Sequence, residues 1–124
     1  MNFIDCSLVE KSDGVYLHTG SFQVKLTEEE GECIKRNTTS SDLILGIRPE
    51  HITLRQKSDE TYEAIVDLVE NLGDEYIIHL KSGDNIIKAL THERLLLNPG
   101  DKVYFSFDRK RMHIIDKKTE KVII

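Results

Sequence analysis

The chain has 124 residues, of which 39% are hydrophobic and 31% charged, and its formal net charge is −5. This composition predicts one folded domain and excludes a disordered chain. The acidic balance argues against generic binding to nucleic acids or anionic membranes, which requires a basic face. No apolar run approaches the ~20 residues of a membrane-spanning helix.

The N-terminal part predicts short strands followed by a helix. Residues 3–10 alternate apolar and polar side chains, which is typical of a half-buried strand. Residues 15–26 form two short β runs on either side of Thr19–Ser21, so a hairpin is expected there. Residues 27–37 break the alternation. They carry glutamates in the first turn and basic residues in the last, as the helix dipole prefers, and therefore predict a short surface helix.

The middle of the chain returns to strands. Residues 43–48 resume the β pattern, and residues 61–73 form the longest strand candidate. Residues 75–80 and 85–90 flank a Lys-Ser-Gly-Asp turn signal and predict another hairpin. Strict alternation in the longest strand would place on one face the side chains of Tyr62, Ala64, Val66 and Leu68.

The C-terminal part predicts a turn and a closing hairpin. Pro99 fixes φ and the following glycine supplies conformational freedom, which favours a reversal there. Residues 103–107 and 112–115 flank Asp108–Arg111 and are expected to pair, with the cationic residues 109–111 as a solvated tip. Many short strands with little helix indicate an all-β fold, either a small barrel or a sandwich.

The sequence contains no phosphate-binding loop and no nucleophile motif. Its five histidines never fall at the spacing of a zinc site. His92 and Glu93 could serve as an acid–base pair, but a polar loop before three leucines is the preferred interpretation. The glutamates at 28–30 and 32 fan around a helix start and do not converge on a cation. We therefore expect no catalytic, cofactor-binding or metal-binding residue in this chain.

The two cysteines, Cys6 and Cys33, form neither a metal-binding nor a redox spacing. No hydrophobic signal segment precedes them, which favours a reducing, cytoplasmic setting and two free thiols. Their spacing alone leaves a disulfide open.

One short stretch, Arg48, Pro49, Glu50 and His51, concentrates charge around a proline within an apolar run. Pro49 lacks a backbone donor, so the preceding strand is expected to end there, and Arg48 should be extended because it precedes proline. We expect this corner to hold Arg48 and Glu50 close together. Two interpretations are possible: a structural corner, or a corner that positions a neighbouring domain or subunit. We favour the structural corner, in which the surface ion pair contributes at most about 1 kcal/mol.

At this corner the sequence resembles a known family. Residues 45–51, LGIRPEH, are similar to the GIRPEH/D motif in the C-terminal regulatory domain of ABC-importer ATP-binding subunits of the maltose/maltodextrin and glycerol-3-phosphate type. Residues 1–3, 65–80 and 99–119 resemble further segments of that domain, in the same order. Two positions depart from the family pattern: Ile115 stands where the family often has Phe, and Glu120 where it often has Gly.

The resemblance implies a single OB-type barrel of the transport-associated (TOBE, MOP-like) kind over residues 1–124, preceded in the parent protein by an ATPase domain. ATP and magnesium would be bound by that other domain. The implied partners are a second copy of the subunit, the membrane permease subunits, and a regulatory protein or small effector. The implied location is the cytoplasmic face of the membrane, and the corner at Arg48, Pro49, Glu50 and His51 would contact partners.

Two other functions remain open from the sequence. Related transport-associated barrels bind oxyanions, and the hydroxyls of residues 38–41 could contribute to such a site, although a polar loop explains them equally well. A nucleic-acid-binding OB-fold ranks last, because it needs aromatic side chains on a basic groove.

Overall fold

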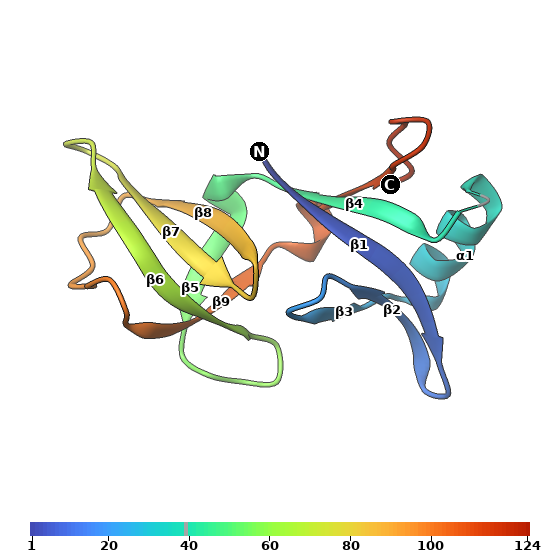
Figure 1. Ribbon diagram of the computed structural model, residues 1–124, viewed down its shortest axis with the longest axis horizontal. Helices are drawn as coiled ribbons and strands as arrows, with labels where there is room; N and C mark the ends of the chain where they lie inside the picture. Colours follow the sequence, from blue (N-terminus) through green and yellow to red (C-terminus); the bar gives the residue numbers. More distant parts are fainter. Residues whose placement is uncertain (39) are drawn as a thin grey trace. The chain divides into compact units, whose positions relative to one another are not determined.

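The computed structural model describes residues 1–38 and 40–124 and contains two five-stranded sheets (Figure 1). The strand orders are β10-β4-β1-β2-β3 and β5-β9-β6-β7-β8. The chain forms two compact units. The barrel unit comprises Met1–Asn2 and Ile47–Arg111, and the helical unit comprises Phe3–Gly46 and Met112–Ile124. The expected all-β class with one short helix is confirmed for the described residues.

The sheet of the helical unit begins with an antiparallel meander. The predicted hairpin at Thr19–Ser21 is present, and Leu17 lies opposite Val24 in it. Inward-facing aliphatic side chains from most of its strands are buried, including those of Ile4, Leu17, Val24, Leu43, Leu45 and Ile114. The strands are β1 (Asn2–Lys11), β2 (Gly14–His18), β3 (Gln23–Lys25), β4 (Asp42–Ile47) and β10 (His113–Asp116).

The predicted helix is also present, as α1 (Glu28–Asn37). Thr27 caps its N-terminus: the Glu30 amide donates to the Thr27 hydroxyl at 3.1 Å, and the Thr27 amide donates to the Glu30 carboxylate at 2.8 Å. This reciprocal capping satisfies backbone donors that the first turn leaves free. Ile34 is fully buried, so α1 contributes to the core of its unit despite its polar sequence.

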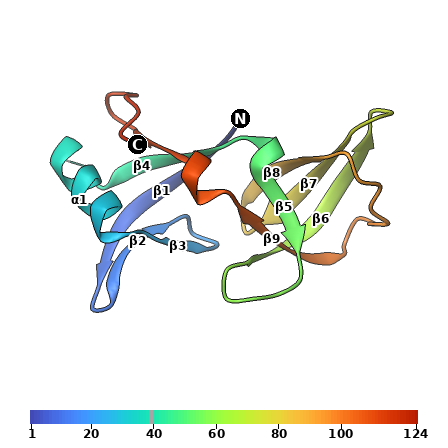
Figure 2. The same ribbon diagram turned by 180° about the vertical axis from the view of Figure 1, so that it is seen from behind.

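The barrel unit contains the second sheet, seen from behind in Figure 2. Its edge strands β8 and β5 pack against each other, so the sheet curls into a small barrel. The interior is filled by the side chains of Ile52, Ala64, Val66, Ile78, Leu80, Ile87, Ala89, Phe105 and Phe107. The strands are β5 (Ile52–Arg55), β6 (Tyr62–Asn71), β7 (Tyr76–Ser82), β8 (Asn85–Thr91) and β9 (Lys102–Phe107).

A β-bulge in β6 corrects the expected face of Leu68. Val66 lies opposite Leu80 and Leu68 lies opposite His79, so Asp67 is an extra residue without a partner on β7. The extra residue shifts the alternation by one, which turns Leu68 outward and leaves its side chain 47% exposed. The prediction that Leu68 shares the buried face of Ala64 and Val66 is therefore wrong.

The expected closing hairpin is also wrong. β9 pairs with β5 and β6, whereas β10 pairs with β4 in the other sheet. The segment between them contains a short 3-10 helix, η2 (Arg109–Arg111), and connects the two sheets. Turn-forming residues mark a change of direction, but the partner of each strand depends on contacts distant in sequence.

The C-terminal turn gives a reason why the family often has glycine at the position of Glu120. The Glu120 amide donates to the Asp116 carbonyl at 2.8 Å, and the Asp116 amide donates to the Lys121 carbonyl at 2.9 Å, which closes a tight turn. Glu120 adopts φ 60°, the left-handed conformation that glycine adopts most readily.

Replacing Glu120 with glycine is expected to raise the free energy of unfolding by about 0.5–1 kcal/mol, because relief of the left-handed strain outweighs the added chain entropy. Glu120→Ala removes the same carboxylate but retains the Cβ, so it serves as the matched control and should give no comparable gain. Denaturant unfolding checks this prediction. Equal changes for both variants would contradict it.

Candidate partner-contact corner

The corner forms the connection between β4 and β5. Arg48 has φ −72° and ψ 141°, the extended conformation expected before a proline. Pro49 opens the short 3-10 helix η1 (Pro49–His51), in which the His51 amide donates to the Arg48 carbonyl at 3.0 Å. The predicted end of the strand at the proline is confirmed to within one residue: β4 ends at Ile47, and the predicted strand included Arg48.

The two charges of the corner do not pair. Arg48 and Glu50 are both exposed, and no ion pair joins them in the part of the chain that the structure describes. A 3-10 helix has three residues per turn, so side chains two positions apart point in different directions. The expectation that the corner holds these charges together is therefore wrong, and both remain available to solvent.

His51 fixes the corner to the barrel. Its carbonyl accepts a hydrogen bond from the Asp108 amide at 3.1 Å, and η1 packs against β8. Its side chain is half-buried, and its Nδ1 atom is buried without a hydrogen-bond partner among the described residues. The hydrogen bond between Asp108 and His51 therefore joins the segment before β5 to the segment after β9.

A shallow hollow of about 500 Å³ lies beside the corner. It mixes carboxylates, hydroxyls and one guanidinium, and so has no single charge that would select an anion or a cation. Its lining residues are Glu50, His51, Thr53, Arg55, Ser106, Phe107 and Asp108.

Only part of the basic stretch at residues 109–111 is the solvated tip expected from the sequence. Arg111 is exposed and lies 3.5 Å from Asp108, whereas Arg109 is half-buried. Burial raises the pKa of Tyr62, and the nearby positive charge of Arg109 offsets part of that rise. Tyr62 also stacks on Phe107, with ring centroids 5.8 Å apart, so Arg109 lies near the aromatic cluster.

Replacing Arg48 and Glu50 together with alanine should change the free energy of unfolding by less than about 0.5 kcal/mol, because both side chains are exposed and neither has an ion-pair partner among the described residues. The two single variants should be additive in a double-mutant cycle. Denaturant unfolding of the four proteins checks this. A coupling energy above about 1 kcal/mol would mean that the two charges interact in solution.

The hydroxyl-rich loop considered as an oxyanion site uses its groups locally. The Thr38 hydroxyl accepts from the Ser40 amide at 3.2 Å, and the Asp42 amide donates to the Ser40 hydroxyl at 3.1 Å. The Lys118 amide, and to a lesser degree the Thr38 hydroxyl, lower the pKa of Asp116. Lys35, beside this loop, is ion-paired with Glu10. Thr39 lies outside the described residues.

The cysteines are separate thiols, with Cys6 buried and Cys33 half-buried. Burial raises the pKa of Cys6 to about 12, so its thiol stays protonated at neutral pH. Across residues 1–38 and 40–124 no cluster of three His, Cys, Asp or Glu side chains is arranged to hold a metal ion. Within the same residues no helix is long and apolar enough to cross a bilayer.

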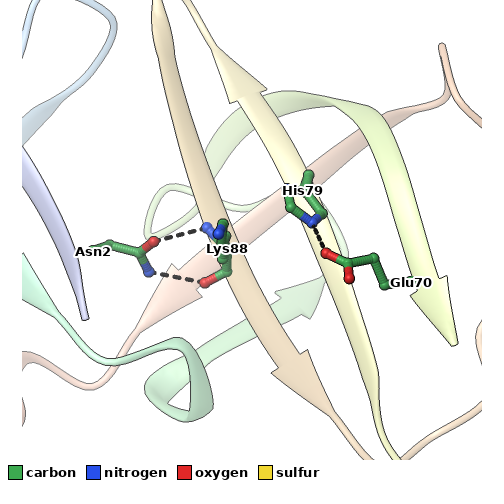
Figure 3. Close-up of polar contacts among 4 residues, drawn as sticks. All are labelled: Asn2, Glu70, His79 and Lys88. Carbon is green, nitrogen blue, oxygen red and sulfur yellow. Dashed lines mark hydrogen bonds and ion pairs between the residues drawn. The ribbon is translucent and has the colours of Figure 1, made fainter. Parts of the chain in front are cut away.

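Sequence reasoning missed two polar contacts of the barrel unit, shown in Figure 3. The buried amide side chain of Asn2 donates to the Lys88 carbonyl at 2.8 Å and accepts from the Lys88 amide at 2.9 Å. On the outward side of β6 and β7, the ring of His79 binds the carboxylate of Glu70. Neither contact has a local sequence signal, because 86 residues separate Asn2 from Lys88 and the bulge sets the face of Glu70.

These features define the class of protein: an all-β module with an OB-type barrel, whose charged corner connects its two sheets. Residues 45–115 match the TOBE domain, and residues 1–52 match the MalK OB fold domain. The chain belongs to the TOBE domain family. The corner at residues 48–51 falls where the two matches overlap.

Several importer subunits are similar to this chain. The trehalose/maltose import ATP-binding protein MalK of Thermococcus litoralis is 33% identical over 99% of the chain and 34% of its own length. The multiple sugar-binding transport ATP-binding protein MsmK of Streptococcus mutans is 33% identical over 99% of the chain and 33% of its own length. The sn-glycerol-3-phosphate import ATP-binding protein UgpC of Psychromonas ingrahamii is 32% identical over 66% of the chain and 24% of its own length. The chain thus spans about a third or less of the length of these relatives.

Proposed function

We propose that this chain is the non-catalytic regulatory and dimerisation domain of the ATP-binding subunit of an ABC importer for sugars. In this proposal a separate domain of the same subunit binds ATP and magnesium and hydrolyses ATP. The subunit acts at the cytoplasmic face of the membrane, together with permease subunits. The domain couples hydrolysis to uptake by holding two ATPase domains together and by receiving inhibitory signals from a regulatory protein or small effector.

The observation that carries the proposal is the match of nearly the whole chain to about a third of two sugar-import ATP-binding proteins. A domain of this kind adds a second contact between two ATPase domains. Tethering raises their effective concentration to about the millimolar range for short linkers. The corner at Arg48, Pro49, Glu50 and His51 is suited to partner contact, because the charges of Arg48 and Glu50 are exposed and have no ion-pair partner within residues 1–38 and 40–124. The backbone of the corner is fixed by η1.

Self-association of the chain tests the dimerisation part. Sedimentation equilibrium should detect a weak two-fold dimer, since closed two-fold pairs are the most common homo-oligomers. A strict monomer up to millimolar concentration would remove dimerisation from the proposal.

Nucleotide assays test the non-catalytic part. Calorimetry with Mg-ATP should give no saturable micromolar binding to this chain. The full-length subunit and a version lacking this domain should both hydrolyse ATP at saturating protein concentration, but the truncated version should lose its inhibitory responses. Loss of hydrolysis on truncation, or unchanged inhibition, would replace the regulatory role with a structural one.

A further inference from the structure

The outward side of β6, β7 and β8 carries a patch of exposed branched aliphatic side chains. The register places Ile86 opposite Lys81 and Lys81 opposite Ile65, so these three form one row across the sheet. In the next row, the outward-turned Leu68 lies opposite His79, and His79 lies opposite Lys88. The exposed fractions of Ile65, Leu68 and Ile86 are 46%, 47% and 46%. We call this surface the outer barrel face, with members Ile65, Leu68, Lys81, Ile86 and Lys88.

Two carboxylates beside the outer barrel face are engaged, whereas that of the bulge residue Asp67 is exposed. Glu70 is bound by the ring of His79, which lies on β7 between β6 and β8 (Figure 3). Glu63 lies 3.5 Å from the ammonium group of Lys102. Neither lysine of the face has a carboxylate partner within residues 1–38 and 40–124. The face therefore combines exposed apolar side chains with unpaired positive charge, in a chain whose net charge is −5.

We propose that the outer barrel face binds a protein partner whose contact surface presents apolar side chains interleaved with carboxylates. Such a partner would cover the aliphatic side chains, and its carboxylates would pair with Lys81 and Lys88. A second copy of this chain fits poorly, because a two-fold contact through this face would bring four unpaired ammonium groups together. This inference goes beyond the proposed function, since a dimer would have to use another surface.

Two other anionic occupants are less suited to the face. Each lysine near an anionic lipid surface adds only a small electrostatic attraction, so two lysines hold a membrane weakly. Single-stranded nucleic acid needs aromatic platforms for its bases, and the outer barrel face has none among its members.

The test uses a peptide as the probe. A synthetic strand-forming peptide that carries Leu and Glu in turn along one face, with Thr on the other face, is titrated into the isotope-labelled chain. The same peptide with Lys in place of Glu serves as the control. Amide NMR shifts should move on β6, β7 and β8 with the acidic peptide alone, and the affinity should fall with added salt. Lys81→Glu with Lys88→Glu should weaken binding by about fivefold or more, because both charge contacts with the peptide are lost.

Matched variants separate this face from general effects. Lys110→Glu reverses an exposed charge elsewhere in the barrel unit and should change the affinity less than about twofold. Ile86→Thr should weaken binding, whereas Leu96→Thr should not, because Leu96 is 87% exposed but lies in the loop after β8. Native spectra of the free variants confirm that they are folded.

Several outcomes would overturn the proposal. They are equal binding of the two peptides, shifts located outside the face, or unchanged affinity after the double charge reversal. Binding of phosphatidylglycerol vesicles or of single-stranded RNA at this face, without the acidic peptide, would assign it to a lipid or nucleic acid instead. Loss of self-association in Ile86→Thr would show that the outer barrel face is the dimer contact. All of these are independent of the nucleotide assays that test the proposed function.

Discussion

Replacing Phe105 with alanine is expected to lower the free energy of unfolding by about 3–5 kcal/mol, the largest effect of any single change considered for this chain. Phe105 is fully buried in the barrel unit, and its ring centroid lies 5.6 Å from that of Tyr62. The loss combines the transfer free energy of the ring with a cavity that the surrounding strands cannot fully close. A small domain has only about 5–15 kcal/mol of stability, so this variant should be partly unfolded at 37 °C.

The adjacent Tyr104 provides the control for Phe105. It lies on the same strand with its side chain half-exposed, and the ammonium group of Lys57 lies 5.9 Å from its ring centroid. Tyr104→Ala should cost clearly less than Phe105→Ala, because part of the Tyr104 side chain is still accessible to water. Denaturant unfolding followed by far-UV circular dichroism measures both. Similar losses for the two variants would mean that β9 does not present Phe105 to a packed interior.

The second large effect is expected at Asn2. Its amide makes both hydrogen bonds to the backbone of Lys88 in place of a neighbouring strand, which closes the edge of β8. Asn2→Ala leaves two peptide groups without these partners and should cost about 2–3 kcal/mol, less if water reaches them. Asn2→Asp should also destabilise, since a carboxylate accepts from the Lys88 amide but repels its carbonyl.

Lys88→Ala is the control for Asn2, because both hydrogen bonds involve the backbone of Lys88 and its side chain is exposed. This variant should change the free energy of unfolding by less than about 0.5 kcal/mol. Hydrogen exchange adds a local readout: protection of the Lys88 amide should fall in Asn2→Ala and persist in Lys88→Ala. Unchanged protection in Asn2→Ala would show that the side chain does not hold this edge in solution.

Local patterns in the sequence predicted most of the elements but not how they are paired. The helix at Glu28–Asn37, the hairpin at Thr19–Ser21 and the end of β4 near Pro49 all have signals within a few residues, and each was predicted. The partners of β9 and β10 were not predicted, because a turn signal at Asp108–Arg111 is equally compatible with a hairpin and with a change of sheet.

The candidate site was predicted in its backbone but not in its charges. The proline determined the extended Arg48 and the turn that follows, as expected. The orientation of Arg48 relative to Glu50 depends on η1, and Arg109 lies close enough to Tyr62, on a distant strand, to lower its pKa. The role of the corner in partner contact stays a prediction.

The bulge at Asp67 also makes β6 tolerant of a change in length. Removing Asp67 would join Val66 directly to Leu68, and ordinary alternation would then keep Val66 inward and Leu68 outward. Val69 would still lie opposite Ile78, so neither face of the strand would be inverted. A one-residue deletion, which reverses every following side chain in a regular strand, would at this position leave the barrel interior and the outer barrel face with the same residues.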